Sequence, residues 1–256
     1  MKNNSTDQTK QDEYFKSNII NMIHFARNRN SPKFSAFLDE RQQIIAQEIL
    51  NASKYSNYKF FGGLENCDRV ILGVFPERQP MQNDAFPITS LKLTYSDKNE
   101  ISHRDCLGSL MGLQIKRESI GDIVVLDTCS ILFADNDIAD FICLNLDKVG
   151  RANVKVTIAD GVEIEKKQEY QEITGTVSSL RLDCIIALLL NKSRTVATQT
   201  IQANLVKVNY QDEQNVSKQI SEGDVITIRG KGKFIVEGPI KKTKKDRCFI
   251  TINKLL

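Results

Sequence analysis

Residues 181–210 read RLDCIIALLLNKSRTVATQTIQANLVKVNY, and they contain the strongest structural signals of the C-terminal part of the chain. Apolar residues recur at helical spacing at positions 182, 185, 186 and 189, which predicts a helix with one apolar face. Ser193 is a suitable N-cap for a second helix, and Asn204 tolerates the left-handed conformation that ends one. We therefore expect two short helices followed by a strand.

The strand begins at Val206, and its side chains alternate between two faces. Val206 and Val208 point one way, so Lys207 and Asn209 point the other. Gly223-Asp224 predicts a turn before a second strand over 225–229. The segment after it, Gly230-Lys231-Gly232-Lys233, contains glycines that allow backbone to approach a ligand closely.

Two arginines occupy unfavourable places in this pattern. Arg181 and Arg194 come at the starts of the two helices, where the helix dipole disfavours a cation by a few tenths to about 1 kcal/mol. A helix start with free N–H groups and an arginine fork is suited to phosphate. The pattern predicts a site for an anion, although ordinary solvated surface cations are the alternative interpretation.

The candidate nucleic-acid-binding residues share a cationic or hydrogen-bonding side chain at a helix start, on the strand face or in the glycine turn. They are Arg181, Lys192, Ser193, Arg194, Lys207, Asn209, Arg229, Lys231 and Lys233.

Charge is distributed unevenly along the 256 residues, whose net charge is +3. Residues 179–256 hold 14 Lys+Arg and 7 Asp+Glu, or 14 − 7 = +7, and the remainder holds 21 − 25 = −4. A basic end on a mildly acidic body indicates a nucleic-acid or anionic membrane partner. The whole-chain value excludes a histone-like protein and an acidic disordered chain.

Membrane, export and metal signals are weak. The longest apolar run, residues 184–190, is far shorter than the roughly 18 residues of a membrane span. The polar start lacks a signal-peptide core, and the six cysteines stand singly beside only two histidines. We expect a cytoplasmic protein with reduced thiols, no metal and no cofactor.

The sequence predicts an α+β protein in four parts. These are an N-terminal helical domain over 1–66, a central ferredoxin-like sandwich over 67–160, a charged linker or exposed edge over 161–178, and a small C-terminal α/β domain over 179–256. The central sandwich would resemble RNA-recognition motifs, which stack bases on strand aromatics. Phe75, Tyr95 and Phe133 are candidates for stacking, but core packing explains each at least as well.

The C-terminal pattern resembles the S-four RNA-binding domain, and nearly the whole chain resembles the YlmH family of cytosolic S-four proteins. The N-terminal and central motifs that carry this resemblance are Phe61-Gly62-Gly63-Leu64-Glu65 with Arg69, His103-Arg104-Asp105-Cys106-Leu107-Gly108, Ile115-Lys116-Arg117-Glu118 and Ile120-Gly121-Asp122-Ile123. Departures include Asn204 where the domain usually has glycine, and Tyr210 where glycine or tryptophan often follows the asparagine.

The resemblance implies binding to ribosomal RNA and tRNA on the large ribosomal subunit, in the rescue of stalled ribosomes. It places the candidate residues on the RNA face, in a protein expected to be a monomer when free. Cations on phosphates make such affinity fall steeply with salt.

Two alternatives remain: an RNA-modifying enzyme anchored by its S-four domain, and a protein-docking scaffold linked to cell division. Arg181-Leu182-Asp183 resembles a pseudouridine-synthase tripeptide, and His103-Arg104-Asp105 resembles a kinase catalytic loop. The other residues of the kinase set are missing, and the 73 residues after Asp183 are too few for a pseudouridine-synthase catalytic domain. Asp105 and Asp183 are therefore interpreted as early-helix carboxylates, which the helix dipole stabilises. We predict no catalytic residue.

Overall fold

The computed structural model describes residues 3–95, 101–159, 170–242 and 247–255. The chain divides into two compact units, Met1–Lys166 and Lys167–Leu256, and each is described by itself. Within the described residues, no helix combines the length and the apolar character that crossing a bilayer requires.

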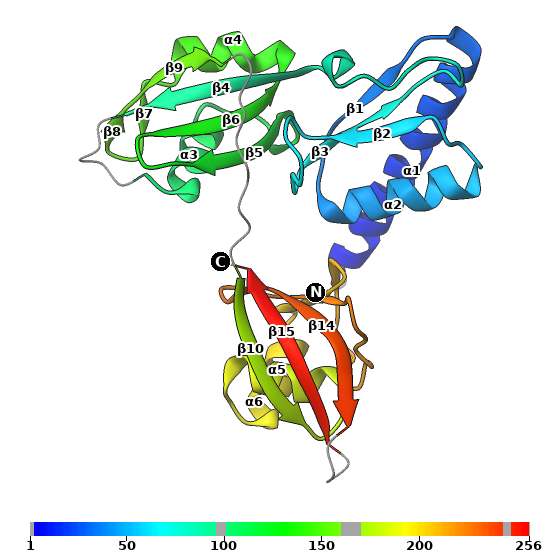
Figure 1. Ribbon diagram of the computed structural model, residues 1–256, viewed down its shortest axis with the longest axis vertical. Helices are drawn as coiled ribbons and strands as arrows, with labels where there is room; N and C mark the ends of the chain where they lie inside the picture. Colours follow the sequence, from blue (N-terminus) through cyan, green and yellow to red (C-terminus); the bar gives the residue numbers. More distant parts are fainter. Residues whose placement is uncertain (1–2, 96–100, 160–169, 243–246, 256) are drawn as a thin grey trace. The chain divides into compact units, whose positions relative to one another are not determined.

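The N-terminal part of the first unit is a small antiparallel sheet covered by two helices (Figure 1). Its elements are α1 (Asn3–Arg29), β1 (Lys33–Leu38), α2 (Glu40–Ala52), β2 (Tyr58–Phe61) and β3 (Val70–Val74). A capping box starts α2, in which Asp39 accepts from the N–H of Gln42 and Gln42 accepts from that of Asp39. The helices expected in the N-terminal part are present as α1 and α2, which bury Ile19 and Ile45.

The expectation of a purely helical segment up to residue 66 is wrong, because β1 and β2 lie inside it. The run over 69–75 was expected in the central sandwich, but β3 pairs with β1 and β2 in the order β1-β3-β2. Every residue of β3 is buried, with Leu72 packed toward the helices and Ile71 toward the central sheet. A strand covered on both faces gives no sign in its own sequence of the sheet that it joins.

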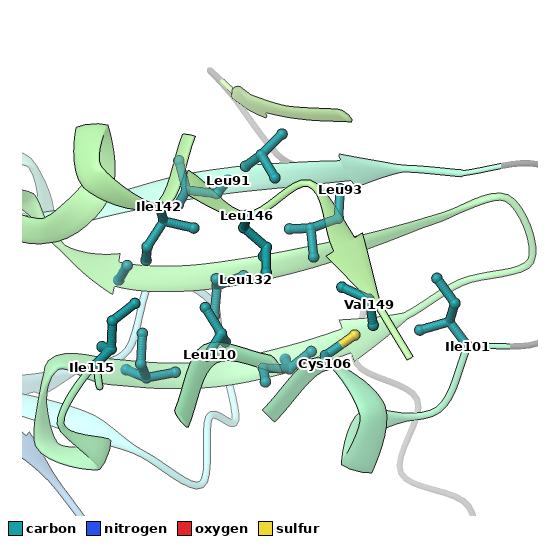
Figure 2. Packing of buried hydrophobic residues seen from close by; sticks show 14 of the residues in the cluster. Leu91, Leu93, Ile101, Cys106, Leu110, Ile115, Leu132, Ile142, Leu146 and Val149 are labelled. Carbon is teal, nitrogen blue, oxygen red and sulfur yellow. The ribbon is translucent and has the colours of Figure 1, made fainter. Parts of the chain in front are cut away.

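The central part has the ferredoxin-like order βαββαβ, as expected. Its main elements are β4 (Ile88–Thr94), α3 (His103–Gly112), β5 (Ile120–Val125), β6 (Cys129–Asp135), α4 (Asn136–Asn145) and β9 (Lys155–Ile158). The antiparallel sheet has the order β5-β6-β4-β9, and a hairpin of β7 (Lys148–Val149) and β8 (Ala152–Asn153) follows α4. Figure 2 shows the core between helices and sheet, where Leu110 and Ile142 meet Leu91 and Leu132.

The second unit is a six-stranded antiparallel sheet with two helices packed on one face (Figure 1). Its elements are β10 (Tyr170–Val177), α5 (Leu182–Leu190), α6 (Arg194–Gln202), β11 (Val206–Val208), β12 (Gln211–Asp212), β13 (Val225–Ile228), β14 (Gly232–Lys242) and β15 (Cys248–Leu255). The strand order is β10-β15-β14-β13-β11-β12.

Of the two alternatives expected for 161–178, a linker or an exposed edge, the second is confirmed for the second half of the stretch. Residues 160–169 lie outside the described part, but β10 pairs with β15 from Tyr170 to Val177. This strand lies at the sheet edge, and its inward side carries Ile173, Gly175 and Val177. Because an edge strand buries little apolar surface, its composition resembles that of a linker.

Candidate nucleic-acid interface

The two helix starts of the second unit are built as the sequence predicted, with different caps. Arg181 is the N-cap residue of α5 and makes no side-chain cap, whereas Ser193 caps α6 by accepting from the N–H of Val196 at 3.4 Å. Between the helices, Asn191 has a left-handed conformation with φ of 50°. This conformation reverses the chain within a few residues and brings the start of α6 beside α5.

Asp183 joins the two helix starts. Its side chain is 5% exposed and accepts from Arg181 Nε at 3.1 Å and from Arg194 Nη2 at 2.5 Å. A second hydrogen bond from Arg181 Nη2 to Asp183, at 3.3 Å, makes the pairing of Arg181 with this carboxylate bidentate. One buried carboxylate therefore holds two guanidinium groups that lie 13 residues apart in the chain (194 − 181).

This arrangement changes the interpretation of the two unfavourable arginines. Asp183 is itself an anion that offsets part of the unfavourable interaction of these two cations with the helix dipoles. Burial alone would raise the pKa of Asp183, but hydrogen bonds from Arg181 and Arg194 outweigh it and hold that pKa at about 2. The same hydrogen bond raises the pKa of Arg194.

The start of α5 also differs from the expected cradle of free N–H groups. The N–H groups of Leu182 and Asp183 donate to the carbonyls of Lys218 and Val216, and that of Cys184 donates to Asp183 Oδ1. Backbone at this helix start is therefore occupied within the chain. Any phosphate here would meet side-chain donors instead.

Side-chain donors remain available. The Arg181 side chain is 35% exposed and that of Arg194 is 56% exposed, and the two keep a net charge of +1 after Asp183 is counted. A guanidinium has five N–H donors; Arg181 commits two groups to Asp183 and Arg194 commits one. Lys192, also exposed, lies in the turn just before α6. We call Arg181, Lys192 and Arg194 the arginine pole.

The lysines of the strands form a separate group. In the register of β11, β13 and β14, Lys207 lies opposite Thr227, which lies opposite Lys233. The flanking residues Val206 and Val208 pack into the core beneath the helices. Lys207 and Lys233 therefore project from the sheet face that the helices leave open, not from the same face as the helix starts.

The lysine group has local partners. Lys207 Nζ lies 3.7 Å from Asp212 Oδ1, and Lys233 Nζ lies 5.5 Å from the ring centroid of Tyr210. Arg229 and Lys231 are exposed in the turn from β13 to β14, where Gly230 and Gly232 have φ of 76° and 110°. These left-handed conformations show that the two glycines serve the turn, whereas their sequence pattern indicated close approach of a ligand, which stays a prediction.

Asn209 holds a turn with both polar atoms of its side chain. Its amide accepts from the N–H of Val225 at 2.9 Å and donates to Asp224 Oδ1 at 2.8 Å, and its φ of 48° begins a two-residue turn. Tyr210 completes that turn with φ of 65°, a conformation that explains why glycine is usual here. Sequence alternation places Asn209 on the outer face, and in the structure one amide N–H and the amide oxygen also serve this turn, so RNA contact by Asn209 stays a prediction.

The aspartates that resembled catalytic residues have structural partners. Asp105 forms a capping box with Ser102 at the start of α3, and hydrogen bonds from Ser102 lower its pKa. Asp183 is held by two arginines, as described above. In the parts of the chain that the structure describes, no group of three or more His, Cys, Asp or Glu side chains is placed to hold a metal ion.

A second buried aspartate lies in the first unit, where the N-terminal and central parts meet. Asp122 is 6% exposed and accepts from the backbone N–H groups of Asp68 at 2.9 Å and Arg69 at 3.0 Å. The Arg69 side chain donates to the carbonyls of Ile120 at 3.0 Å and Phe37 at 2.8 Å. Burial lowers the pKa of Arg69.

Arg117 completes this cluster, which we call the junction cluster (Arg69, Arg117 and Asp122). It donates to the carbonyl of Ile120 at 2.6 Å, and its own carbonyl accepts from Arg69 at 3.3 Å. Burial, and after it the charge of Arg69, lowers the pKa of Arg117 to about 10. Three of the motifs quoted for the family resemblance therefore meet at one structural joint, which spacing alone did not reveal.

Comparisons with known proteins match both the central part of the first unit and the second unit. A family model described as "Putative RNA-binding domain in YlmH" matches residues 80–163, and one described as "S4 domain" matches residues 180–226. The structure titled "Cell division protein ylmH from Streptococcus pneumoniae" shares the fold, with a TM-score of 0.50 and 20% identity over 58% of this chain and 91% of that one.

A curated relative covers more of the chain. It is "Ribosome-associated protein quality control protein P2" of Bacillus subtilis (strain 168), 33% identical over 230 residues that make up 87% of each protein. The protein thus belongs to the YlmH family, with a central YlmH domain and a C-terminal S-four domain.

Proposed function

We propose that this protein binds RNA on the large ribosomal subunit, through contacts with ribosomal RNA and tRNA, and acts in ribosome-associated quality control. The name of the Bacillus subtilis relative supports the ribosomal part, and the S-four match supports RNA as the ligand. We place it in the cytoplasm as a monomer when free, with no cofactor. The observation that carries the proposal is the arginine pole.

The arginine pole has features of a site for folded RNA. Asp183 holds Arg181 and Arg194 at a fixed spacing, which reduces the side-chain entropy that two free arginines would lose on binding. Their remaining donors can bind phosphate oxygens in pairs. Such contacts recognise the arrangement of backbone phosphates more than base sequence.

The matched families and the named relative describe RNA binding and quality control, and none of their descriptions names a reaction. We retain the prediction that the protein is not an enzyme.

The test compares two double variants of the full chain. Arg181→Ala with Arg194→Ala should reduce co-sedimentation with purified large subunits at least tenfold, since two charge-assisted contacts are lost. Arg29→Ala with Arg78→Ala is the matched control, because both arginines are exposed and lie in the first unit. Equal co-sedimentation of the two folded variants would overturn the assignment.

A further inference from the structure

The central sheet has one face covered by α3 and α4 and a second face that is divided in two. In RNA-recognition motifs, this second face stacks bases on aromatic residues of the two central strands. Here the central strands are β6 and β4. The question is which part of this face RNA can reach.

The β6 side of the face is closed by the chain's own N-terminal part. Phe133 and Ile131 of β6 are buried in one cluster with Phe37 and Phe75. The contact is close: a Cβ added at Gly63 would lie 2.2 Å from the Phe133 ring. Phe133 therefore cannot stack on a base, and Phe75 and Tyr95 are also buried.

The β4 and β9 side is open, and the exposed residues of the two strands on this face are polar. In the register of the two strands, Lys92 lies opposite Thr157 and Thr94 lies opposite Lys155, and all four residues are exposed. Neither strand contains an acidic residue. We call these four residues the donor strip.

The chemistry of the donor strip favours RNA backbone over a protein partner. Ammonium and hydroxyl groups donate hydrogen bonds to phosphate and sugar oxygens. The aromatic and apolar anchors that centre protein interfaces are absent from these four positions. Between adjacent strands about 5 Å apart, the two cations can reach neighbouring phosphates of one RNA strand.

We propose that the central domain binds the sugar-phosphate backbone of single-stranded RNA through Lys92, Thr94, Lys155 and Thr157, without stacking bases. This inference rests on the proposed RNA-binding function. It assigns to the central domain a contact separate from the arginine pole. The sheet centre, which related folds use for base recognition, serves here to hold the N-terminal part.

The experiment measures anisotropy of a fluorescein-labelled 20-nucleotide oligouridine RNA, and of an abasic RNA of the same length, with the full chain. Lys92→Glu with Lys155→Glu should weaken binding at least tenfold more than the control Arg104→Glu with Lys148→Glu. Both double variants change net charge equally, and Arg104 and Lys148 are exposed in α3 and β7, outside the donor strip. The strip variant should also lower the log–log salt slope by roughly one to two. The abasic RNA should bind as well as oligouridine.

Three results would overturn the proposal: no binding of the unmodified protein to oligouridine, equal losses in the two variants, or marked weakening with abasic RNA. Large-subunit co-sedimentation of the Arg181→Ala, Arg194→Ala variant separates the two claims. If that variant loses co-sedimentation while the strip variant matches its control on oligouridine, only the donor strip is wrong. If co-sedimentation of that variant is unchanged as well, the assignment of the arginine pole fails too, whereas a failure of the unmodified protein to co-sediment would overturn the proposed function itself.

Discussion

Asp122 and Asp183 are both buried beside two arginines, yet the surrounding arginines are used in opposite ways. In the junction cluster, Arg69 and Arg117 donate to backbone carbonyls of the joint between two parts of the first unit. In the arginine pole, Arg181 and Arg194 donate to Asp183 and remain partly exposed.

The pKa directions follow the same division. Burial lowers the pKa of Arg117 to about 10, whereas the hydrogen bond to Asp183 raises the pKa of Arg194. The guanidiniums of the junction cluster are partly desolvated and donate to backbone carbonyls of the joint. Those of the arginine pole stay partly exposed beside Asp183. The same residue types thus stabilise a joint in one place and, under the proposed function, present a binding group in the other.

The largest expected effect comes from removing the aspartate of the junction cluster. Asp122→Ala leaves the N–H groups of Asp68 and Arg69 without their acceptor, and should lower the free energy of unfolding of the first unit by about 3 kcal/mol. Hydrogen exchange read by mass spectrometry should show faster exchange in β3 and β5. Unchanged protection of both strands would contradict the structural role, and peptides from α5 and α6 serve as the internal control.

Acid should lower the stability of the second unit through protonation of Asp183. The native pKa of Asp183 is about 2, below the value of about 4 in an unfolded chain. Its ionised form therefore contributes on the order of 2 kcal/mol above pH 4, and this contribution is lost as pH falls toward 2. Hydrogen exchange of α5 peptides between pH 5 and 2 measures it. Asp183→Asn is the control, and it should lack that part of the acid dependence.

The smallest expected effect concerns RNA affinity, and it shows whether Asp183 positions Arg181 and Arg194 or only reduces the local positive charge. Asp183→Asn raises the net charge by one, so general attraction to phosphate would tighten RNA binding. If Asp183 instead fixes the two arginines, affinity should fall about tenfold, equivalent to about 1.4 kcal/mol, despite the added charge. A filter-binding titration with ribosomal RNA measures the direction. Tighter binding would show that the aspartate does not position the pair.

Local patterns predicted the helices and turns well, because neighbouring residues decide them. The Ser193 cap, the left-handed Asn204 with φ of 61° and the ferredoxin-like order of the central elements all match the sequence-based expectation. The family was likewise recognisable from its ordered motifs. Each of these depends on periodicity, capping or turn chemistry within a few residues.

The pairing of strands and the tertiary contacts between distant segments were not predictable from local patterns. Nothing local distinguishes β3 as a strand of the N-terminal sheet, or β10 as an edge strand instead of a linker. Alternation along β11 placed Asn209 on an outer face, but only the approach of Val225 and Asp224 shows that its amide is used in a turn.

Composition and local pattern are enough to show that the C-terminal end is basic, that arginines begin its two helices, and that the family is one of RNA-binding proteins. Long-range packing was needed to show that Asp183 joins the two arginines, that the strand lysines face the other side of the sheet, and that Phe133 is buried away from any base. This is because charge and periodicity are properties of short segments. The burial of a carboxylate or a ring depends on which distant residues pack against it.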